Sequence, residues 1–415
     1  MANGVLGMLD PERNAAADAP ASAPRYGWVV VATVVLASVS ASLNQFKVPP
    51  LVPVLMDAFG IGLSQAGLLM SVFAATGVIL ALPAGLILRR LGVRATGVVA
   101  VGLVAAGAGW GALAQDFVPL LAGRVVEGAG LTLIAVAGPA AIAPWFRREH
   151  RGAPMGVWAT WVPLGNVVMY NLAPALATST GWRAVWWTGA GFALIALVLY
   201  GRLLRPSPAR AGDDGLPPTE SSQEAVPGLM ASLANRSIWL LGLQFAILNV
   251  VLIGLYTYLP AFLAGERGYS LAGAAFVVSL STAVVLGSAP LAGWLSDRIG
   301  SRRLVITVPF LVIAALLLVP FQVTGWPLYA CLILVGLVSG ATPTATFAAA
   351  PEVMRDPRLA GIGLGVVSLG MNAGMVMGPL LFGALVETAG WAAAGTWMAF
   401  LCVVGFAAAW LVKVR

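Results

Sequence analysis

The sequence predicts an all-α membrane protein with twelve transmembrane helices in two pseudo-symmetric six-helix bundles. Three observations lead to this fold class. The 415 residues are 60% hydrophobic and only 9% charged, and the mean hydropathy is +0.92. About twelve apolar runs each approach or exceed the ~20 residues that a helix needs to cross a bilayer. A short glycine- and arginine-containing pattern also recurs half a chain apart.

The composition excludes two other classes of protein. A chain with so few charged residues has too little polar surface to cover a soluble globule of this size. The net charge of +7 does not indicate a nucleic-acid-binding protein, because the arginines lie between apolar runs and form no basic face on a soluble domain.

Cys331 and Cys402 fall inside apolar runs, so we expect buried thiols and no disulfide.

The chain divides into four parts. Residues 1–25 are rich in Ala, Pro and Asp and predict a disordered cytoplasmic tail. Residues 26–204 and 237–415 predict the N-terminal and C-terminal six-helix bundles, and the proline-rich polar segment 205–236 predicts a cytoplasmic linker between them. The apolar runs lie at about 27–56, 65–88, 94–114, 117–143, 153–177, 184–204, 238–263, 271–296, 303–321, 326–350, 360–386 and 391–412.

The repeated pattern follows the second and eighth runs. One copy, Gly293 to Arg303, reads G-W-L-S-D-R-I-G-S-R-R, and the other, Gly85 to Arg94, reads G-L-I-L-R-R-L-G-V-R, 208 residues earlier. A short basic loop of this kind suits a tight turn at the cytoplasmic end of two membrane helices. The halves also repeat elsewhere, since Pro53 maps onto Pro260 at a similar spacing.

This loop resembles the one between the second and third helices of the major facilitator superfamily of transporters. The resemblance implies a conformational latch at the cytoplasmic face, in which the loop carboxylate docks on a neighbouring helix end. Only the second copy has that carboxylate, because Arg89 stands at the acidic position of the first, so we expect an asymmetric latch. The expected latch residues are Gly85, Arg90, Gly92, Arg94, Gly293, Asp297, Arg298, Gly300, Arg302 and Arg303.

Two further stretches carry the same resemblance. Arg124, Gly128 and Gly130 match a superfamily pattern of an arginine early in the fourth span followed by a glycine-rich stretch. The stretch from Asn44 to Pro50 is most similar to cyanate permeases and monocarboxylate carriers. The family fold implies a central cavity between the halves, lined by the first, fourth, seventh and tenth spans.

The basic residues predict the orientation. If both termini are cytoplasmic, 19 Lys and Arg fall on the inner side and 2 on the outer side. Such an asymmetry favours a multi-pass protein of a bacterial inner membrane with both termini in the cytoplasm.

Charged residues inside spans are costly unless they face a partner or a cavity. Lys47 lies in the first run, and Arg124 and Glu127 lie one helical turn apart on one face of the fourth. Counting from the run midpoints places Lys47 and Arg124 at a similar depth, outward of the bilayer centre, with Glu127 between them and the midplane. The sharper interpretation is that Lys47 and Arg124 hold an anion while Glu127 compensates their charge and takes a proton. The structural alternatives are that Lys47 extends to the outer surface and that Arg124 and Glu127 only stabilise the fold.

Uncharged polar residues in the spans complete the expected site. For each of them a hydrogen bond between helices is the alternative to contact with the substrate. The full set of candidate substrate-binding residues is Lys47, Arg124, Asn44, Gln45, Asn166, Tyr170, Asn249, Tyr256, Thr342 and Asn372. A separate feature is that Gly370, Gly374 and Gly378 recur every fourth residue, a spacing that lets another helix approach closely.

These features predict a secondary active transporter. The sequence has no phosphate-binding loop and no His or Cys cluster at metal spacing, so we expect no enzyme activity, no cofactor and no metal. The excess of cations in the spans predicts a small anionic solute, carboxylate- or cyanate-like, moved with protons by a monomer in the lipid bilayer, with no nucleic-acid partner. Two alternatives remain: an exporter of hydrophobic or cationic compounds, and a membrane receptor or sensor that transports nothing.

Overall fold

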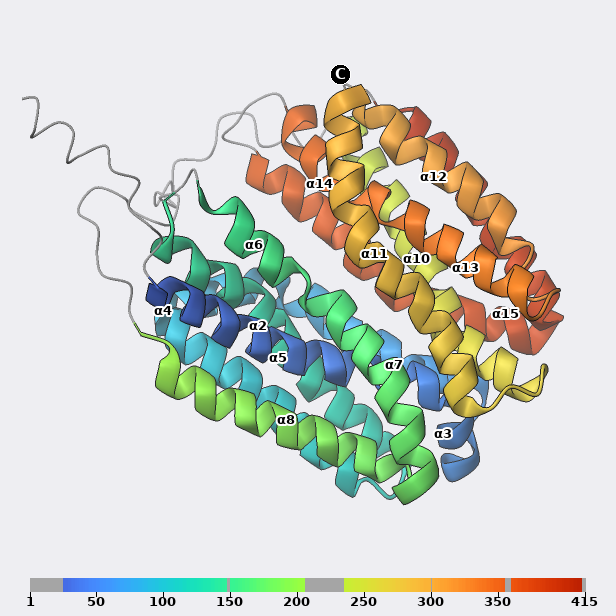
Figure 1. Ribbon diagram of the computed structural model, residues 1–415, viewed down its shortest axis with the longest axis horizontal. Helices are drawn as coiled ribbons and strands as arrows, with labels where there is room; N and C mark the ends of the chain where they lie inside the picture. Colours follow the sequence, from blue (N-terminus) through green and yellow to red (C-terminus); the bar gives the residue numbers. More distant parts are fainter. Residues whose placement is uncertain (1–24, 148–149, 206–234, 300, 355–359, 413–415) are drawn as a thin grey trace, which may run out of the picture.

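The computed structural model describes residues 25–147, 150–205, 235–299, 301–354 and 360–412, and their regular secondary structure is entirely helical. The first half contains α2 (Arg25–Phe46), η1 (Pro49–Leu51), α3 (Val52–Phe59), α4 (Leu63–Leu113), α5 (Phe117–Ile142), η2 (Ala143–Trp145), α6 (Gly152–Ala159), α7 (Trp161–Thr180) and α8 (Trp182–Leu203). The second contains α10 (Arg236–Gly265), α11 (Leu271–Ile299), α12 (Arg302–Leu317), α13 (Trp326–Ser339), α14 (Ala341–Met354) and α15 (Ala360–Trp410). Figure 1 shows the two halves as separate bundles that meet along one side.

Twelve passes follow from these helices. Among the described residues, nine segments are long and apolar enough to cross a membrane. One of the nine holds two passes, because α15 reverses at Gly390, where φ is 81°. Helices α7 and α12 supply the remaining two passes. The predicted all-α fold of twelve membrane helices in two bundles is therefore confirmed.

Loops of the same geometry recur in the two halves. Gly60 and Gly268 have φ of 62° and 69°, and Gly181 and Gly390 have φ of 90° and 81°. Residues with a side chain rarely adopt such angles, so glycine is favoured at each reversal. The last arginines of the two loop copies also make equivalent contacts, each with a backbone carbonyl near the end of the last helix of its half. Arg94 donates to the Gly201 carbonyl near the end of α8, and Arg303 donates to the Trp410 carbonyl at the end of α15.

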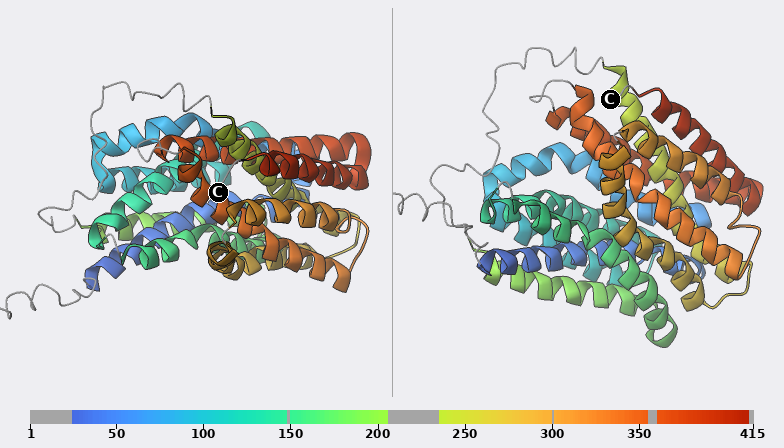
Figure 2. Two further views of the ribbon diagram at one scale, coloured as in Figure 1. Left: turned by 90° about the horizontal axis from the view of Figure 1, so that it is seen from above. Right: turned by 45° about the horizontal axis from the view of Figure 1, so that its top comes forward.

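The helix ends define two faces. We call the face with the start of α2 and the ends of α8 and α15 the terminal face, and the opposite one, with α3 and the Gly181 and Gly390 reversals, the hairpin face. In Figures 1 and 2 the bundles lie close together near α3 and farther apart towards the terminal face. The predicted tail, residues 1–25, lies outside the described residues except for Arg25, and the linker, residues 205–236, except for its ends.

The first pass is broken where its counterpart in the second half is continuous. Helix α2 ends at Phe46, and the chain resumes as η1 at Pro49 and α3 at Val52. Proline lacks a backbone N–H, so Pro49 and Pro50 cannot donate to the carbonyls of residues four earlier. Helix α10 has Pro260 near its end and runs through from Arg236 to Gly265. The single long run predicted at 27–56 is therefore two helices with a break beside Lys47.

Candidate functional site

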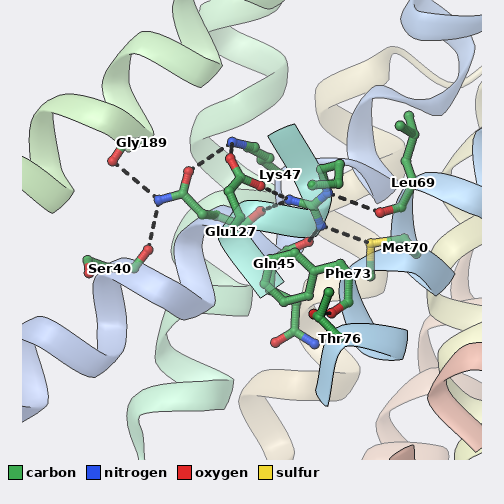
Figure 3. A network of polar contacts seen from close by, with 11 residues as sticks. Ser40, Gln45, Lys47, Leu69, Met70, Phe73, Thr76, Glu127 and Gly189 are labelled. Atoms are coloured by element: carbon green, nitrogen blue, oxygen red, sulfur yellow. Dashed lines mark hydrogen bonds and ion pairs between the residues drawn. The ribbon is translucent and has the colours of Figure 1, made fainter. Parts of the chain in front are cut away.

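Three ionisable side chains form a network inside the first half (Figure 3). Lys47 Nζ lies 2.5 Å from Glu127 Oε1, and Arg124 Nη1 lies 2.5 Å from Glu127 Oε2. None of the three side chains has exposed surface. One carboxylate, that of Glu127, therefore bridges Lys47 and Arg124, the two cations predicted to lie at a similar depth.

The break in the first pass explains the position of Arg124. The end of α2 leaves the carbonyls of Asn44 and Gln45 without helical donors, and Arg124 donates to both, at 2.6 and 3.2 Å. A cation at the C-terminal end of a helix also interacts favourably with the helix dipole. Arg124 therefore caps α2 as well as pairing with Glu127.

All the nitrogens of Arg124 have acceptors. Its Nε donates to the Leu69 carbonyl of α4 at 3.0 Å. Nη2 also lies 4.0 Å from Met70 Sδ, and the guanidinium carbon lies 4.2 Å from the centroid of the Phe73 ring. A guanidinium has five N–H donors, and here the carbonyls, Glu127 and the sulfur account for them. Arg124 has no donor left for a solute in this conformation.

Lys47 is held by fewer groups. Its ammonium donates to Asn44 Oδ1 at 2.9 Å and to Glu127 Oε1, and it lies 4.6 Å from the centroid of the Trp186 ring. Asn44 is oriented in turn by donating to the carbonyls of Ser40 and Gly189, at 2.8 and 3.3 Å. Lys47 does not extend to the surface, and its side chain is fully buried.

The walls of the network come from the first half. The contacts above are made by α2, α4, α5 and α8, and Gly107 and Gly189 make room for it. A Cβ at Gly107 would lie 2.8 Å from Glu127 Cγ, and one at Gly189 would lie 2.3 Å from Asn44 Oδ1. The network is nevertheless close to the second half along α4. Met70 touches Arg124, and the next residue, Ser71, donates to the Val376 carbonyl of α15 at 2.7 Å.

A second group of predicted residues lies where the two halves meet. Tyr170 donates to the backbone carbonyl of Tyr256 at 2.8 Å across the halves, and the Tyr256 hydroxyl lies 2.9 Å from Ser281 Oγ. Asn372 of α15 faces α4, since a Cβ at Gly77 would lie 3.0 Å from its Oδ1. Together with Asn171, which donates to Ser279 Oγ at 3.1 Å, these residues form what we call the seam.

The other three candidates lie apart from the charged network. Asn249 donates to the Phe245 carbonyl of its own helix at 2.8 Å. Asn166 and Thr342 are buried, and Asn166 Oδ1 and Thr342 Oγ1 have no partner within the described part of the chain. The structure therefore divides the ten predicted residues between the network, the seam and these three further positions, of which Asn249 packs against Gly374 of α15.

The structure describes some of the predicted latch residues in full and others only in part. Gly92 has φ of 77° and allows α4 to reverse direction, and Arg94 and Arg303 cap α8 and α15 as stated above. Gly85, Arg90 and Arg298 lie in helices at the terminal face. Gly293, Asp297 and Arg302 lie in α11 and α12, but their side chains are outside the described part, as is Gly300 altogether.

Sequence reasoning missed two sets of contacts. Trp186 gave no signal beyond being one of several tryptophans in its region, yet its ring packs on Lys47. Glu387 and Ser64 lie just outside predicted apolar runs, and they bond across the halves on the hairpin face. An acidic residue at the end of a long apolar run was the available sequence signal for the second set.

The architecture defines a class of protein. Two six-helix bundles with charged groups buried within them are typical of secondary transporters. A family model described as Major Facilitator Superfamily matches residues 34–366, and the chain belongs to this superfamily. It is a secondary transporter and not an enzyme.

Individual relatives are distant. A hexuronate transporter of Bacillus subtilis is 24% identical over 243 residues, which are 58% of this chain and 57% of that protein, less than two thirds of its length. A chloramphenicol resistance protein of Streptomyces lividans is 26% identical over 293 residues, or 70% of this chain and 69% of that one. A bacterial homologue of the human lysosomal transporter Spinster, solved in an inward-facing and occupied conformation, superposes with a TM-score of 0.77 at 18% identity, covering 94% of this chain and 97% of that one. This last likeness shows the fold.

Proposed function

We propose that this transporter moves a small carboxylate- or cyanate-like anion across the bacterial inner membrane by alternating access, coupled to protons. The observation that carries the proposal is the charge of the buried network. Within the described part of the chain, Lys47 and Arg124 both form their ion pair with the same carboxylate, that of Glu127. The network therefore holds one excess positive charge.

That excess charge favours an anion between the halves. The carbonyl dipoles at the end of α2 offset part of it, but they carry only partial charge, roughly half an elementary charge at a helix end. Inside a bilayer, charges interact more strongly than in water, about 4 kcal/mol at 4 Å for an effective dielectric constant of 20. The hexuronate transporter among the relatives is also named for an anion, since hexuronate is a carboxylate.

The geometry suggests different roles for the two cations. Arg124 has acceptors for all its donors, so we assign it to holding the end of α2 and Glu127. Lys47 lies on a non-helical stretch directly before η1, which packs against α10 of the other half. We infer that separation of the halves on the hairpin side lets Lys47 exchange Glu127 for the anion. Glu127, which then has one counter-charge instead of two, takes the proton.

The uncharged candidates have supporting roles in this proposal. Asn44 and Gln45 hold the network, and Asn166, Tyr170, Asn249, Tyr256, Thr342 and Asn372 offer hydrogen bonds to the solute. The loop residues, with Asp297 as the one carboxylate, act as the latch at the terminal face. We place that face in the cytoplasm, because the basic residues collect there, and we take the transporter to be a monomer.

The alternatives receive less support. Export of hydrophobic or cationic compounds, suggested by the chloramphenicol resistance relative, needs a carboxylate available to a cation. Glu127 is bonded to two cations instead. A receptor that binds the anion without moving it is separated from a transporter by flux measurements.

The test uses purified protein in vesicles with a panel of radiolabelled anions, including hexuronate, small carboxylates, cyanate and nitrite. We expect wild-type protein to accumulate at least one of them when the outer solution is acidic. Lys47→Met removes the excess charge while the pair between Arg124 and Glu127 remains, and it should lower uptake at least tenfold. Saturable binding without flux would favour the receptor, and efflux of hydrophobic cations would favour the exporter.

A charge-matched variant separates the roles of the two residues. Glu127→Gln combined with Lys47→Met restores one excess positive charge, now on Arg124 alone. If Lys47 contacts the anion, this double variant stays as inactive as Lys47→Met. If only the field of the network matters, anion uptake returns but no longer responds to a pH gradient. Normal uptake and normal pH dependence in both variants would contradict the proposal.

A further inference from the structure

Glu387 joins the two halves on the hairpin face. It lies near the end of the first pass of α15, three residues before the reversal at Gly390. Its Oε1 accepts a hydrogen bond from the backbone N–H of Ser64 at 3.0 Å, and its Oε2 accepts one from the Ser64 hydroxyl. Ser64 belongs to α4 of the other half and is half-buried, whereas Glu387 is exposed on this face.

Helix α4 lacks a cap of its own at this end. The first N–H groups of a helix need acceptors, which the side chain of the N-cap residue commonly supplies. The N-cap here is Gly62, which has no side chain, and Gln65 reaches back only to the N–H of Gly62, at 3.1 Å. Glu387 therefore takes the place of the missing cap, and its negative charge suits the positive end of the helix dipole.

The space around Glu387 is shaped for this contact. A Cβ at Gly62 would lie 2.5 Å from Glu387 Oε1, so a side chain there would displace the carboxylate. A Cβ at Gly383 would lie 3.1 Å from Ser64 Cα. Nearby, the Tyr258 hydroxyl lies 2.9 Å from both the Leu63 and the Pro379 carbonyls. The contacts of Ser64 with Glu387 and of Leu63 with Tyr258 join the two halves and exist only while these lie together, whereas the contact between Tyr258 and Pro379 lies within the second half.

We propose that Glu387 is a positioning residue of the transport cycle: by capping α4 from the opposite half, it selects the conformation that is closed at the hairpin face. When the halves separate on that side, the Glu387 carboxylate and the Ser64 N–H both form hydrogen bonds with water instead of with each other. A contact made in one of two states shifts the equilibrium towards that state. This inference does not depend on the chemistry of the solute.

The test measures the closed and open populations without substrate. Spin labels at Ser179 of α7 and Ala272 of α11, both exposed near the hairpin face, report the separation of the halves by double electron–electron resonance in nanodiscs. Glu387→Gln removes the charge but keeps the shape, and we expect it to raise the ratio of open to closed molecules about five- to tenfold. Gly62→Ser supplies a cap within α4 and displaces Glu387, so it should act in the same direction. The two changes together should add little to either alone.

The matched control is Glu266→Gln, which removes another exposed carboxylate on the same face, at the end of α10. It should leave the distance distribution unchanged. Wild-type distributions in both Glu387→Gln and Gly62→Ser would overturn the proposal, as would an equal shift in Glu266→Gln. A lower melting temperature in Glu387→Gln without a change in the distances would show a purely structural contact and would also overturn it. Because no substrate enters the measurement, failure here leaves the anion proposal untouched.

Discussion

Arg124 donates hydrogen bonds to three backbone carbonyls in addition to its ion pair with Glu127. The sequence predicted its pairing with Glu127, because residues three apart share a helix face. The carbonyls of Asn44, Gln45 and Leu69 could not be predicted. They come from the end of α2 and from α4, and their availability depends on the break at Pro49 and on how three helices pack. Local spacing therefore identified the ion pair, whereas tertiary packing determined which further groups Arg124 binds.

Arg124→Lys tests this account because it keeps the charge but not the fork-shaped donor set. A lysine cannot serve three carbonyls and Glu127 together, so buried acceptors would lose their partner. We expect a loss of stability of about 2–4 kcal/mol, seen as a lower melting temperature in detergent. Arg183→Lys is the control, because Arg183 donates to one carbonyl, that of Ala114, and should lose less than about 1 kcal/mol. Equal melting temperatures for the two variants would contradict the capping role of Arg124.

Helices α10 and α15 show how small residues set the distance between elements. A Cβ at Gly370 would lie 2.2 Å from the Gly242 carbonyl, and one at Gly374 would lie 2.2 Å from that of Ala246. Gly378 meets Val250 in the same way, at 2.7 Å. The close approach predicted from the spacing of the three glycines is confirmed, and the partner helix is α10.

We expect Gly374→Ala to push α10 away and to destabilise the second half by about 1–3 kcal/mol. Gly365→Ala on the same helix is the control, because nothing lies within 4 Å of its Cβ position. That substitution should be neutral or stabilise the protein by up to about 1 kcal/mol, since alanine favours a helix over glycine. Thermal unfolding of both variants in detergent checks the difference. If the Gly374→Ala protein were as stable as the Gly365→Ala protein, α10 would be able to move away from α15 without loss of stability, and the prediction would be wrong.

The extent of each element was largely predictable, because a membrane span is defined by its own apolar length. The run at 117–143 corresponds to α5, and the run at 238–263 to α10. The break beside Lys47 was not predicted, although Pro49 and Pro50 signal one. Prolines are common within the other helices here, including Pro139 and Pro260, and those helices continue through them. Whether a proline breaks a span depends on partners such as Arg124 that satisfy the freed carbonyls.

For the whole molecule, the cross-half bonds show which side is closed. The contacts of Leu63, Ser64 and Ser71 with the second half all lie towards the hairpin face, as do those of Tyr170 and Asn171. No local pattern in the sequence predicts this state, because both conformations use the same helices. Whether the closed side faces the cytoplasm or the outside depends on how the protein is oriented in the membrane. The distribution of basic residues is the argument for that orientation.

The orientation is tested by labelling whole cells with an impermeant thiol reagent, in a variant whose buried Cys331 and Cys402 are changed to alanine. Single cysteines at Ser179 and Glu266, exposed near the hairpin face, should react from outside. Cysteines at Arg202 and Ser301, near the terminal face, should react only after the cells are opened. We expect this pattern because basic residues stay on the cytoplasmic side of an inner membrane, and it would make the structure the inward-facing state. The reverse pattern would place the termini outside and make the same structure outward-facing, so that Glu387 would act as a clamp on the cytoplasmic side.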